Sequence, residues 1–118
     1  TPLWLAAWKG HHTLIEELLR HKDIDVNAAD ATGCSPLLIA TKQEHIQVVD
    51  QIIGRGIPEM DINQQDSSGC SPLHAGVMNG DYTIIQPDIV KVLLTQEGLD
   101  VNGKNSKGST PLILALSQ

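Results

Sequence analysis

The strongest constraint in this sequence is a three-residue motif that occurs four times at nearly equal intervals. Thr1-Pro2-Leu3 returns as Ser-Pro-Leu at residue 35 and again at 71, and as Thr-Pro-Leu at 110, so the spacings are 34, 36 and 39 residues. A period of this length is the signature of an architecture built from one repeated supersecondary unit. Because such a unit cannot bury its apolar face alone, consecutive units are expected to stack into a solenoid.

Each motif predicts the start of a helix. Serine or threonine is a favoured N-cap, and proline suits the first helical position because it has no N–H to leave unbonded. Three of the four motifs follow an Asp or Asn with Gly three positions later, which is the preference of a type I turn. An Asp-Val-Asn or Asp-Ile-Asn triplet stands before each of these turns and is interpreted as a short extended arm, at residues 25–27, 61–63 and 100–102.

Paired aliphatic residues predict a second helix in each unit, because their spacing of i, i+1, i+4 and i+5 places them on one buried face. The pairs are Leu14, Ile15, Leu18 and Leu19; Val48, Val49, Ile52 and Ile53; and Ile89, Val90, Leu93 and Leu94. The expected helices cover residues 2–9 and 13–20, 36–43 and 46–54, 72–79 and 87–96, with a further one from 111. The fold class is therefore all-α, with stacked antiparallel helix pairs.

The Thr-Pro-Leu-x-x-Ala unit, with Gly10-His11, the paired aliphatics and the Asp-Val-Asn arm, resembles the ankyrin repeat over essentially the whole chain. This resemblance implies an ankyrin-repeat solenoid with protruding turn or hairpin arms. We expect one domain over residues 1–118, as a segment of a longer chain, with repeats at about 1–34, 35–70, 71–109 and a partial repeat at 110–118. Residues Asp81 to Gln86 are interpreted as an insert that either folds onto neighbouring helix ends or contacts a partner.

Charge and hydropathy exclude several classes of partner. The 118 residues carry a net charge of −6, from 8 Lys and Arg against 14 Asp and Glu, and the basic residues form no cluster. Nucleic acid and anionic membranes both favour a concentrated basic surface, so neither is expected as a partner. No apolar run approaches the roughly 20 residues of a membrane helix, and the N-terminus lacks signal-peptide features. The expectation is a soluble protein.

Cys34 and Cys70 occupy the same position in consecutive units, two residues before the proline. Stacked helices lie about 8 to 10 Å apart, whereas a disulfide requires Cα atoms within about 7 Å. Two free thiols are therefore predicted, which is consistent with a reducing, cytoplasmic location.

No arrangement of residues predicts catalysis, a cofactor or a metal site. The five histidines are scattered without ligand spacing, and Gly54-Arg55-Gly56 follows a helix rather than a strand, so it is interpreted as a cap. Cys70 and His74 lie four residues apart, but no third residue is evident that would orient the histidine as a base. The resemblance instead gives His74 a structural hydrogen-bonding role, and His11 and His45 the helix-start position.

In the ankyrin family, partners are typically held by the turn tips and the outward side of the first helices, which line a concave surface. Carried onto this sequence, the candidate partner-binding residues are Trp8, Lys9, Ala31, Thr32, Lys42, Gln43, Ser67, Ser68, Met78, Asn79, Ser106 and Lys107. Trp8 and Met78 are the favoured anchors by residue type. For Trp8 an alternative stays open, namely packing against a repeat that precedes it.

The resemblance implies a non-enzymatic scaffold that binds another protein and is monomeric as a segment. The alternative is a regulatory or substrate-presenting segment of a larger multidomain enzyme or effector. Asn27 and Asn102 also resemble the arm asparagine that is hydroxylated in some members of the family, so their modification is a further hypothesis.

Overall fold

The computed structural model describes residues 1–78 and 87–116 and shows a row of helix pairs. The helices in this part are α1 (Pro2–Lys9), α2 (His12–Leu19), α3 (Pro36–Lys42), α4 (Ile46–Gly54), α5 (Pro72–Val77), α6 (Pro87–Leu94) and α7 (Pro111–Leu116). No strand is assigned among these residues. The predicted all-α solenoid is confirmed, and the helix bounds lie within two residues of the expected ones where both ends are described. Asn79 and the insert Asp81 to Gln86 lie outside the described residues.

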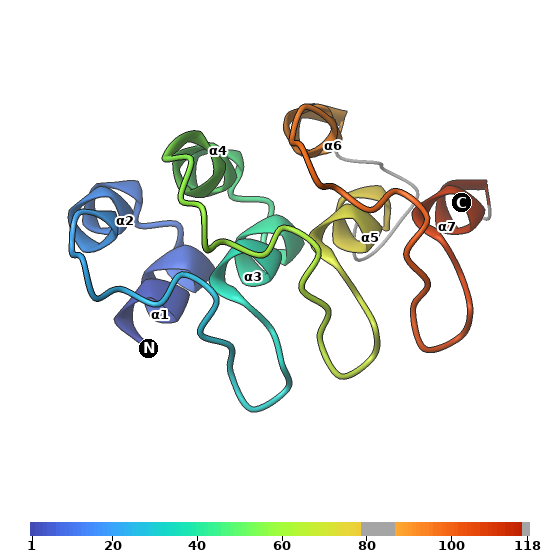
Figure 1. Cartoon of the computed structure of the whole chain (residues 1–118), viewed down its shortest axis with the longest axis horizontal. Helices are drawn as coiled ribbons and strands as arrows, with labels where there is room; N and C mark the ends of the chain where they lie inside the picture. Colours follow the sequence, from blue (N-terminus) through green and yellow to red (C-terminus); the bar gives the residue numbers. More distant parts are fainter. Residues whose placement is uncertain (79–86, 117–118) are drawn as a thin grey trace.

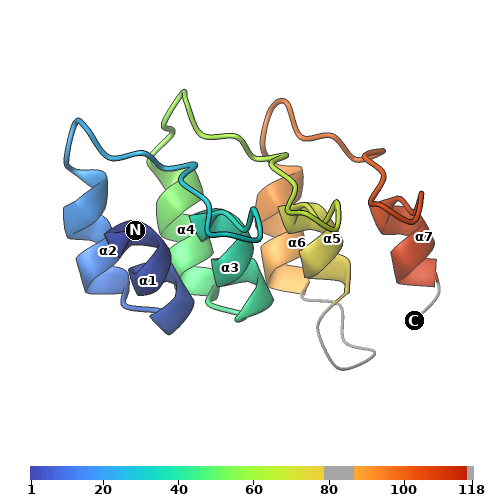
Figure 2. The same cartoon turned by 90° about the horizontal axis from the view of Figure 1, so that it is seen from below.

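Two rows of helices and a set of hairpins make up the solenoid. The first helices of the units, α1, α3, α5 and α7, stand side by side, and the second helices, α2, α4 and α6, form a second row that lies above them in Figure 1. Hairpin loops extend from the first-helix row on the side away from the second helices. In Figure 2 the arms run along one edge of the stack, each leading from a second helix to the next hairpin.

The predicted N-caps are present at all four helix starts. In each case the hydroxyl oxygen accepts a bond from the backbone N–H three residues later, which satisfies one of the unbonded amides of the first turn. The four pairs are Thr1 and Trp4 at 3.2 Å, Ser35 and Leu38 at 3.1 Å, Ser71 and His74 at 3.3 Å, and Thr110 and Ile113 at 3.3 Å.

The apolar stripe of the second helices is buried in full only in α4, where Val48, Val49, Ile52 and Ile53 are all between 0 and 5% exposed. The prediction was wrong for Leu14 in α2 and Leu94 in α6, which are 47% and 56% exposed. Helix α4 has a described second helix on each side, whereas α2 and α6 each have one on a single side. Burial of this stripe therefore depends on neighbouring repeats and not on the helix itself.

Asparagines join consecutive arms. Asn27 donates through Nδ2 to the carbonyl oxygen of Glu59 at 2.6 Å and accepts through Oδ1 from the amide of Asp61 at 2.7 Å. Asn63 repeats both bonds one unit later, to the carbonyl of Gly98 and from the amide of Asp100, each at 2.7 Å. These bonds fix the spacing between repeats along the arm edge of the solenoid.

Candidate partner-binding surface

The hairpins that protrude beside the first helices are locked by one side chain each. Asp30 Oδ1 accepts bonds from the amide of Thr32 at 2.8 Å, its hydroxyl at 2.6 Å and the amide of Cys34 at 3.0 Å. Asp66 makes the same set with Ser68 and Cys70. The predicted turn is confirmed, because the amide of Gly33 also bonds to the carbonyl of Asp30 at 3.0 Å.

Neighbouring hairpins are also bonded to each other. The amide of Ser67 donates to the carbonyl of Thr32 at 2.8 Å, and the amide of Ser106 donates to the carbonyl of Ser68 at 3.0 Å. The three hairpins therefore form a continuous, internally bonded wall along one side of the first helices.

Lys42 lies between this wall and the helices, where its Nζ contacts Asp66 Oδ2 at 2.9 Å. Burial by itself would raise the pKa of Asp66, but the bonds from Lys42, Ser68 and Cys70 lower it to about 2. Burial opposes the charged form of Lys42 too, and the bond to Asp66 outweighs it, so the pKa of Lys42 is raised. The predicted site residue Lys42 is thus a charge that the protein already pairs internally.

The Lys42–Asp66 pair makes stability depend on pH. Because the folded pKa of Asp66 is depressed, its contribution is present above the unfolded value of about 3.9 and is lost as the pH falls through about 2. We expect the pair to contribute about 1 kcal/mol to the free energy of unfolding, since the Lys42 side chain is 37% exposed and solvent weakens the attraction. Urea unfolding of the wild type and Asp66→Asn should show a free-energy difference at about pH 6 that shrinks towards pH 2.5. A difference that stays constant with pH would contradict this assignment.

Both cysteines are free, as predicted. Cys34 is 3% exposed and Cys70 is partly buried, and each sulfur lies near the carbonyl oxygen of the following serine, at 3.8 and 3.6 Å. Burial raises the pKa of both thiols, that of Cys70 to about 11. At neutral pH they are protonated, so neither is an activated nucleophile.

His74 has the structural role that the resemblance implied. Its Nδ1 lies 2.7 Å from the hydroxyl of Ser71, and its Nε2 lies 3.0 Å from the carbonyl oxygen of Ser109 in the next repeat. The residue is 1% exposed. Since both ring nitrogens are already engaged with Ser71 and Ser109, the arrangement does not form a nucleophile and base.

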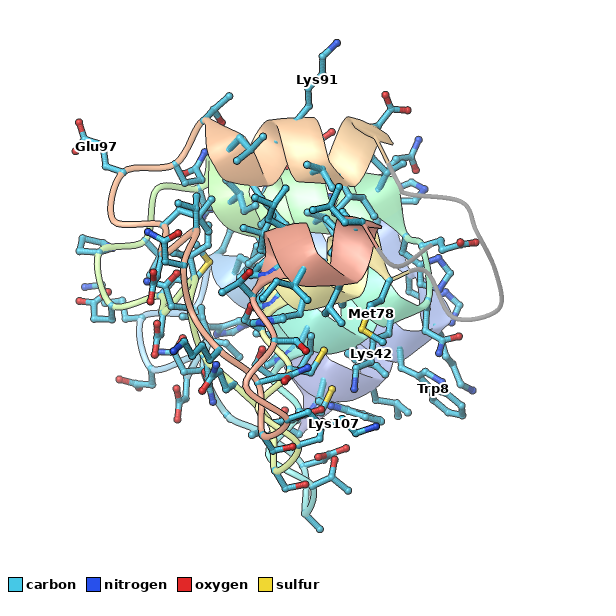
Figure 3. The ribbon with its side chains drawn as sticks, turned by 90° about the vertical axis from the view of Figure 1, so that its right-hand side faces the viewer. Trp8, Lys42, Met78, Lys91, Glu97 and Lys107 are labelled. Atoms are coloured by element: carbon cyan, nitrogen blue, oxygen red, sulfur yellow. The ribbon has the colours of Figure 1, made fainter. Side chains whose placement is uncertain are left out.

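Eleven of the twelve predicted partner-binding residues lie in the described part, and all eleven are exposed. Trp8 is 43% and Met78 is 41% exposed, and Figure 3 places both, with Lys42 and Lys107, on the side of the stack that carries the hairpins. Lys91 and Glu97 lie elsewhere in that view. We call the surface between the first helices and the hairpins the groove face.

Leu5 was not among the residues predicted to bind a partner, although it is 48% exposed and lies one turn before Trp8 on α1. Its position three residues before Trp8 was the available signal, because residues i and i+3 share a helix face. The rings of Trp4 and Trp8 are 6.0 Å apart between centroids, so Trp8 also rests against the preceding turn of its own helix.

Neither a metal centre nor a membrane-spanning helix is found in the described residues. They contain no group of three or more His, Cys, Asp and Glu side chains placed to hold a metal ion. None of their helices combines the length and apolar character needed to cross a membrane.

Comparison with known proteins agrees with this architecture. The family described as "Ankyrin repeats (3 copies)" matches residues 1–66, and the family described as "Ankyrin repeat" matches residues 68–106. Over 55 residues the chain is 34% identical to alpha-latrocrustotoxin-Lt1a of Latrodectus tredecimguttatus, a match that spans 47% of this chain and 4% of the toxin. The helix pairs, the N-cap motifs and these matches together place the chain in the ankyrin-repeat family.

Proposed function

We propose that this chain is a non-enzymatic scaffold that binds a partner protein through its groove face. The observation that carries the proposal is the pair of large apolar side chains, Trp8 and Met78, left exposed on one face of a rigid wall of helices and hairpins. Ankyrin repeats are in general protein-binding modules. Exposed aromatic and methionine side chains on a rigid surface are the residue types most often found as binding anchors.

The rest of the groove face is suited to matching the shape and polarity of a partner and contributes little binding free energy. The hairpin tips carry small or polar residues such as Thr32, Ser67 and Ser68, which offer little apolar area. The two anchors stand on α1 and directly after α5, with α3 between them, so a partner that contacts both must span the middle repeat. We propose one domain that acts as a monomer in the cytoplasm, without a cofactor or metal.

A second candidate is a regulatory or substrate-presenting segment within a larger protein. The relative in Latrodectus favours it, because the match spans 4% of a far longer chain. In that case the same groove face would hold a segment of the larger assembly instead of a separate partner. Affinity capture with the full-length protein from its own cell, followed by mass spectrometry, distinguishes the two.

Binding of the captured partner is expected to depend on the groove face. Trp8→Ala and Met78→Ala should each weaken it by about tenfold or more, which corresponds to the loss of a binding anchor. Their unfolding free energies should change little, because both side chains are exposed. Isothermal titration of purified partner with each variant measures the effect.

Exposed residues of the second helices provide the controls. Lys91→Ala on α6 and Glu17→Ala on α2 should leave the affinity unchanged. Gln51 is unsuitable as a control, because its Nε2 donates to the carbonyl oxygen of His12 at 2.8 Å and helps to join α4 to α2. Weaker binding in the control variants, with normal binding in the groove variants, would reverse the proposed orientation.

A further inference from the structure

The groove face contains equivalent aspartates in two consecutive hairpins. One is paired with a lysine side chain, and the other has a carboxylate oxygen without a partner among the described residues. In the hairpin before α5, Asp66 uses Oδ1 for the turn and Oδ2 for Lys42 Nζ, at 2.9 Å. In the hairpin before α3, Asp30 uses Oδ1 for the same turn bonds. Within the residues the structure describes, no hydrogen bond or ion pair reaches Asp30 Oδ2.

The reason lies in the first helix that faces each hairpin. Lys42 comes seven residues after its N-cap Ser35, and the residue seven after the N-cap Thr1 is Trp8. The helices α1 and α3 pack side by side and start with the same cap, so Trp8 takes on α1 the place that Lys42 takes on α3. The first repeat therefore has the carboxylate without the lysine.

Cys34 contacts Asp30 and Trp4 contacts Trp8, and both Cys34 and Trp4 pack in the same hydrophobic core. The amide of Cys34 donates to Asp30 Oδ1 at 3.0 Å. Trp4 packs against the hydrophobic core that includes Cys34, and its buried indole nitrogen has no hydrogen-bond partner among the described residues. The Trp4 ring in turn lies 6.0 Å from the Trp8 ring. Trp8 is 43% exposed and stands on α1 at the position that Lys42 holds on α3.

The charges around Asp30 favour a cation. The bond from the Thr32 hydroxyl, with help from the amides of Cys34 and Thr32, lowers the pKa of Asp30, so it is ionised at neutral pH. Lys42 is the cation that acts on both carboxylates, but it is bonded to Asp66. Asp30, Asp66 and Lys42 together leave one negative charge uncompensated on the groove face.

From this comparison of the two repeats we propose that Asp30 and Trp8 form a binding site for a basic side chain, arginine or lysine, presented by a protein partner. The ammonium or guanidinium pairs with Asp30 Oδ2, and its aliphatic stem or planar head lies against the Trp8 ring, which attracts cations through its face. The Lys42–Asp66 pair is the internal example of this contact. The net charge of −6 adds a long-range attraction for basic segments. This inference rests on the proposed function and names the partner chemistry at one end of the groove face.

A peptide probe tests the site directly. The probe is a ten-residue serine and glycine peptide with one central arginine, and its control carries citrulline, the uncharged isostere, at the same position. Titration into the isotopically labelled chain should give saturable NMR shifts at the Trp8 indole N–H and the Thr32 amide. The citrulline peptide should bind at least about tenfold more weakly, because a charge-assisted contact is lost.

Two variants assign the effect to these residues. Asp30→Asn should weaken binding of the arginine peptide by at least about tenfold. The turn should be preserved, since Asn105 accepts the same amide bonds in the third hairpin. Asp25→Asn is the matched control, because Asp25 is also exposed and accepts an amide bond, from Asn27 at 3.0 Å, but lies in the arm. It should bind as the wild type does.

Trp8→Lys places a lysine on α1 at the position that Lys42 holds on α3. The new lysine is expected to pair with Asp30, to weaken binding of the arginine peptide by about tenfold and to lower the pKa of Asp30 further. The carboxyl titration is readable by NMR without any partner, and circular dichroism confirms the fold.

Three results would overturn the site: no saturable shifts, equal binding of the citrulline peptide, or undiminished binding by Asp30→Asn. A captured partner that needs Met78 but not Asp30 would refute the site and leave the groove face in place. If the captured partner binds the Trp8 and Met78 variants normally while the arginine peptide still binds the wild type, only the proposed function is refuted.

Discussion

Replacing Ile52 with alanine is expected to lower the free energy of unfolding by about 2 to 5 kcal/mol. Ile52 is 0% exposed in α4, whose stripe is covered by helices of both neighbouring repeats. Truncation removes buried apolar atoms and leaves a cavity that those neighbours can only partly fill. Equilibrium unfolding in urea, followed by circular dichroism, measures the loss.

Leu14 supplies the matched control, since it belongs to the equivalent stripe of α2 but is 47% exposed. Leu14→Ala should cost less than about 1 kcal/mol, because little buried contact is lost. Leu18, which is partly buried in the same helix, should give an intermediate value. Similar losses for Ile52 and Leu14 would mean that neighbouring repeats do not determine the burial of this stripe.

Gly69→Ala is expected to be the most damaging change in the hairpin wall. Gly69 has φ of 77°, and an added Cβ would lie 2.5 Å from the amide nitrogen of Ser106 and 2.7 Å from the Cα of Asn105. Both atoms are backbone, so relief requires the next hairpin to move. That movement would stretch the bond from the Ser106 amide to the Ser68 carbonyl, now 3.0 Å.

Gly108→Ala distinguishes the cost of the left-handed backbone from the cost of the steric clash. Gly108 has φ of 78°, and nothing lies within 4 Å of the position that a Cβ would take, so Gly108→Ala should cost only about 1 to 2 kcal/mol for the left-handed backbone. Gly69→Ala should lose about 1 to 3 kcal/mol more from the clash. Faster hydrogen exchange of the Ser106 amide in Gly69→Ala would locate the damage between hairpins. Equal losses at the two glycines would show that the hairpins are not tightly bonded to each other.

A rigid wall matters for binding as well as for stability. Asp30, Asp66 and Asn105 hold the three hairpins in the same turn, and the bonds between hairpins set their spacing. A partner then meets a preformed surface and loses less free energy to ordering than it would on flexible loops. Gly69→Ala is therefore expected to weaken partner binding even though Gly69 is not an anchor.

Features that depend on contacts within about five residues could be predicted from the sequence. Helix starts follow from Ser or Thr before Pro, and hairpins follow from Asp or Asn with Gly, because each cap or turn bonds its own backbone a few positions away. The free state of Cys34 and Cys70 also followed, since equal positions in stacked units are too far apart to bond.

Contacts between repeats could not be predicted, because they depend on how the repeats stack. Leu14 and Val48 occupy the same place in their helices, yet one is 47% and the other 1% exposed, because a neighbouring repeat covers only the second. The pairing of Lys42 with Asp66 joins residues 24 positions apart, and nothing local to either residue indicates it. The open carboxylate of Asp30 became visible only by comparison with that pair. Stacking sets these contacts, since a side chain between two repeats is partnered by whatever the neighbouring repeat presents.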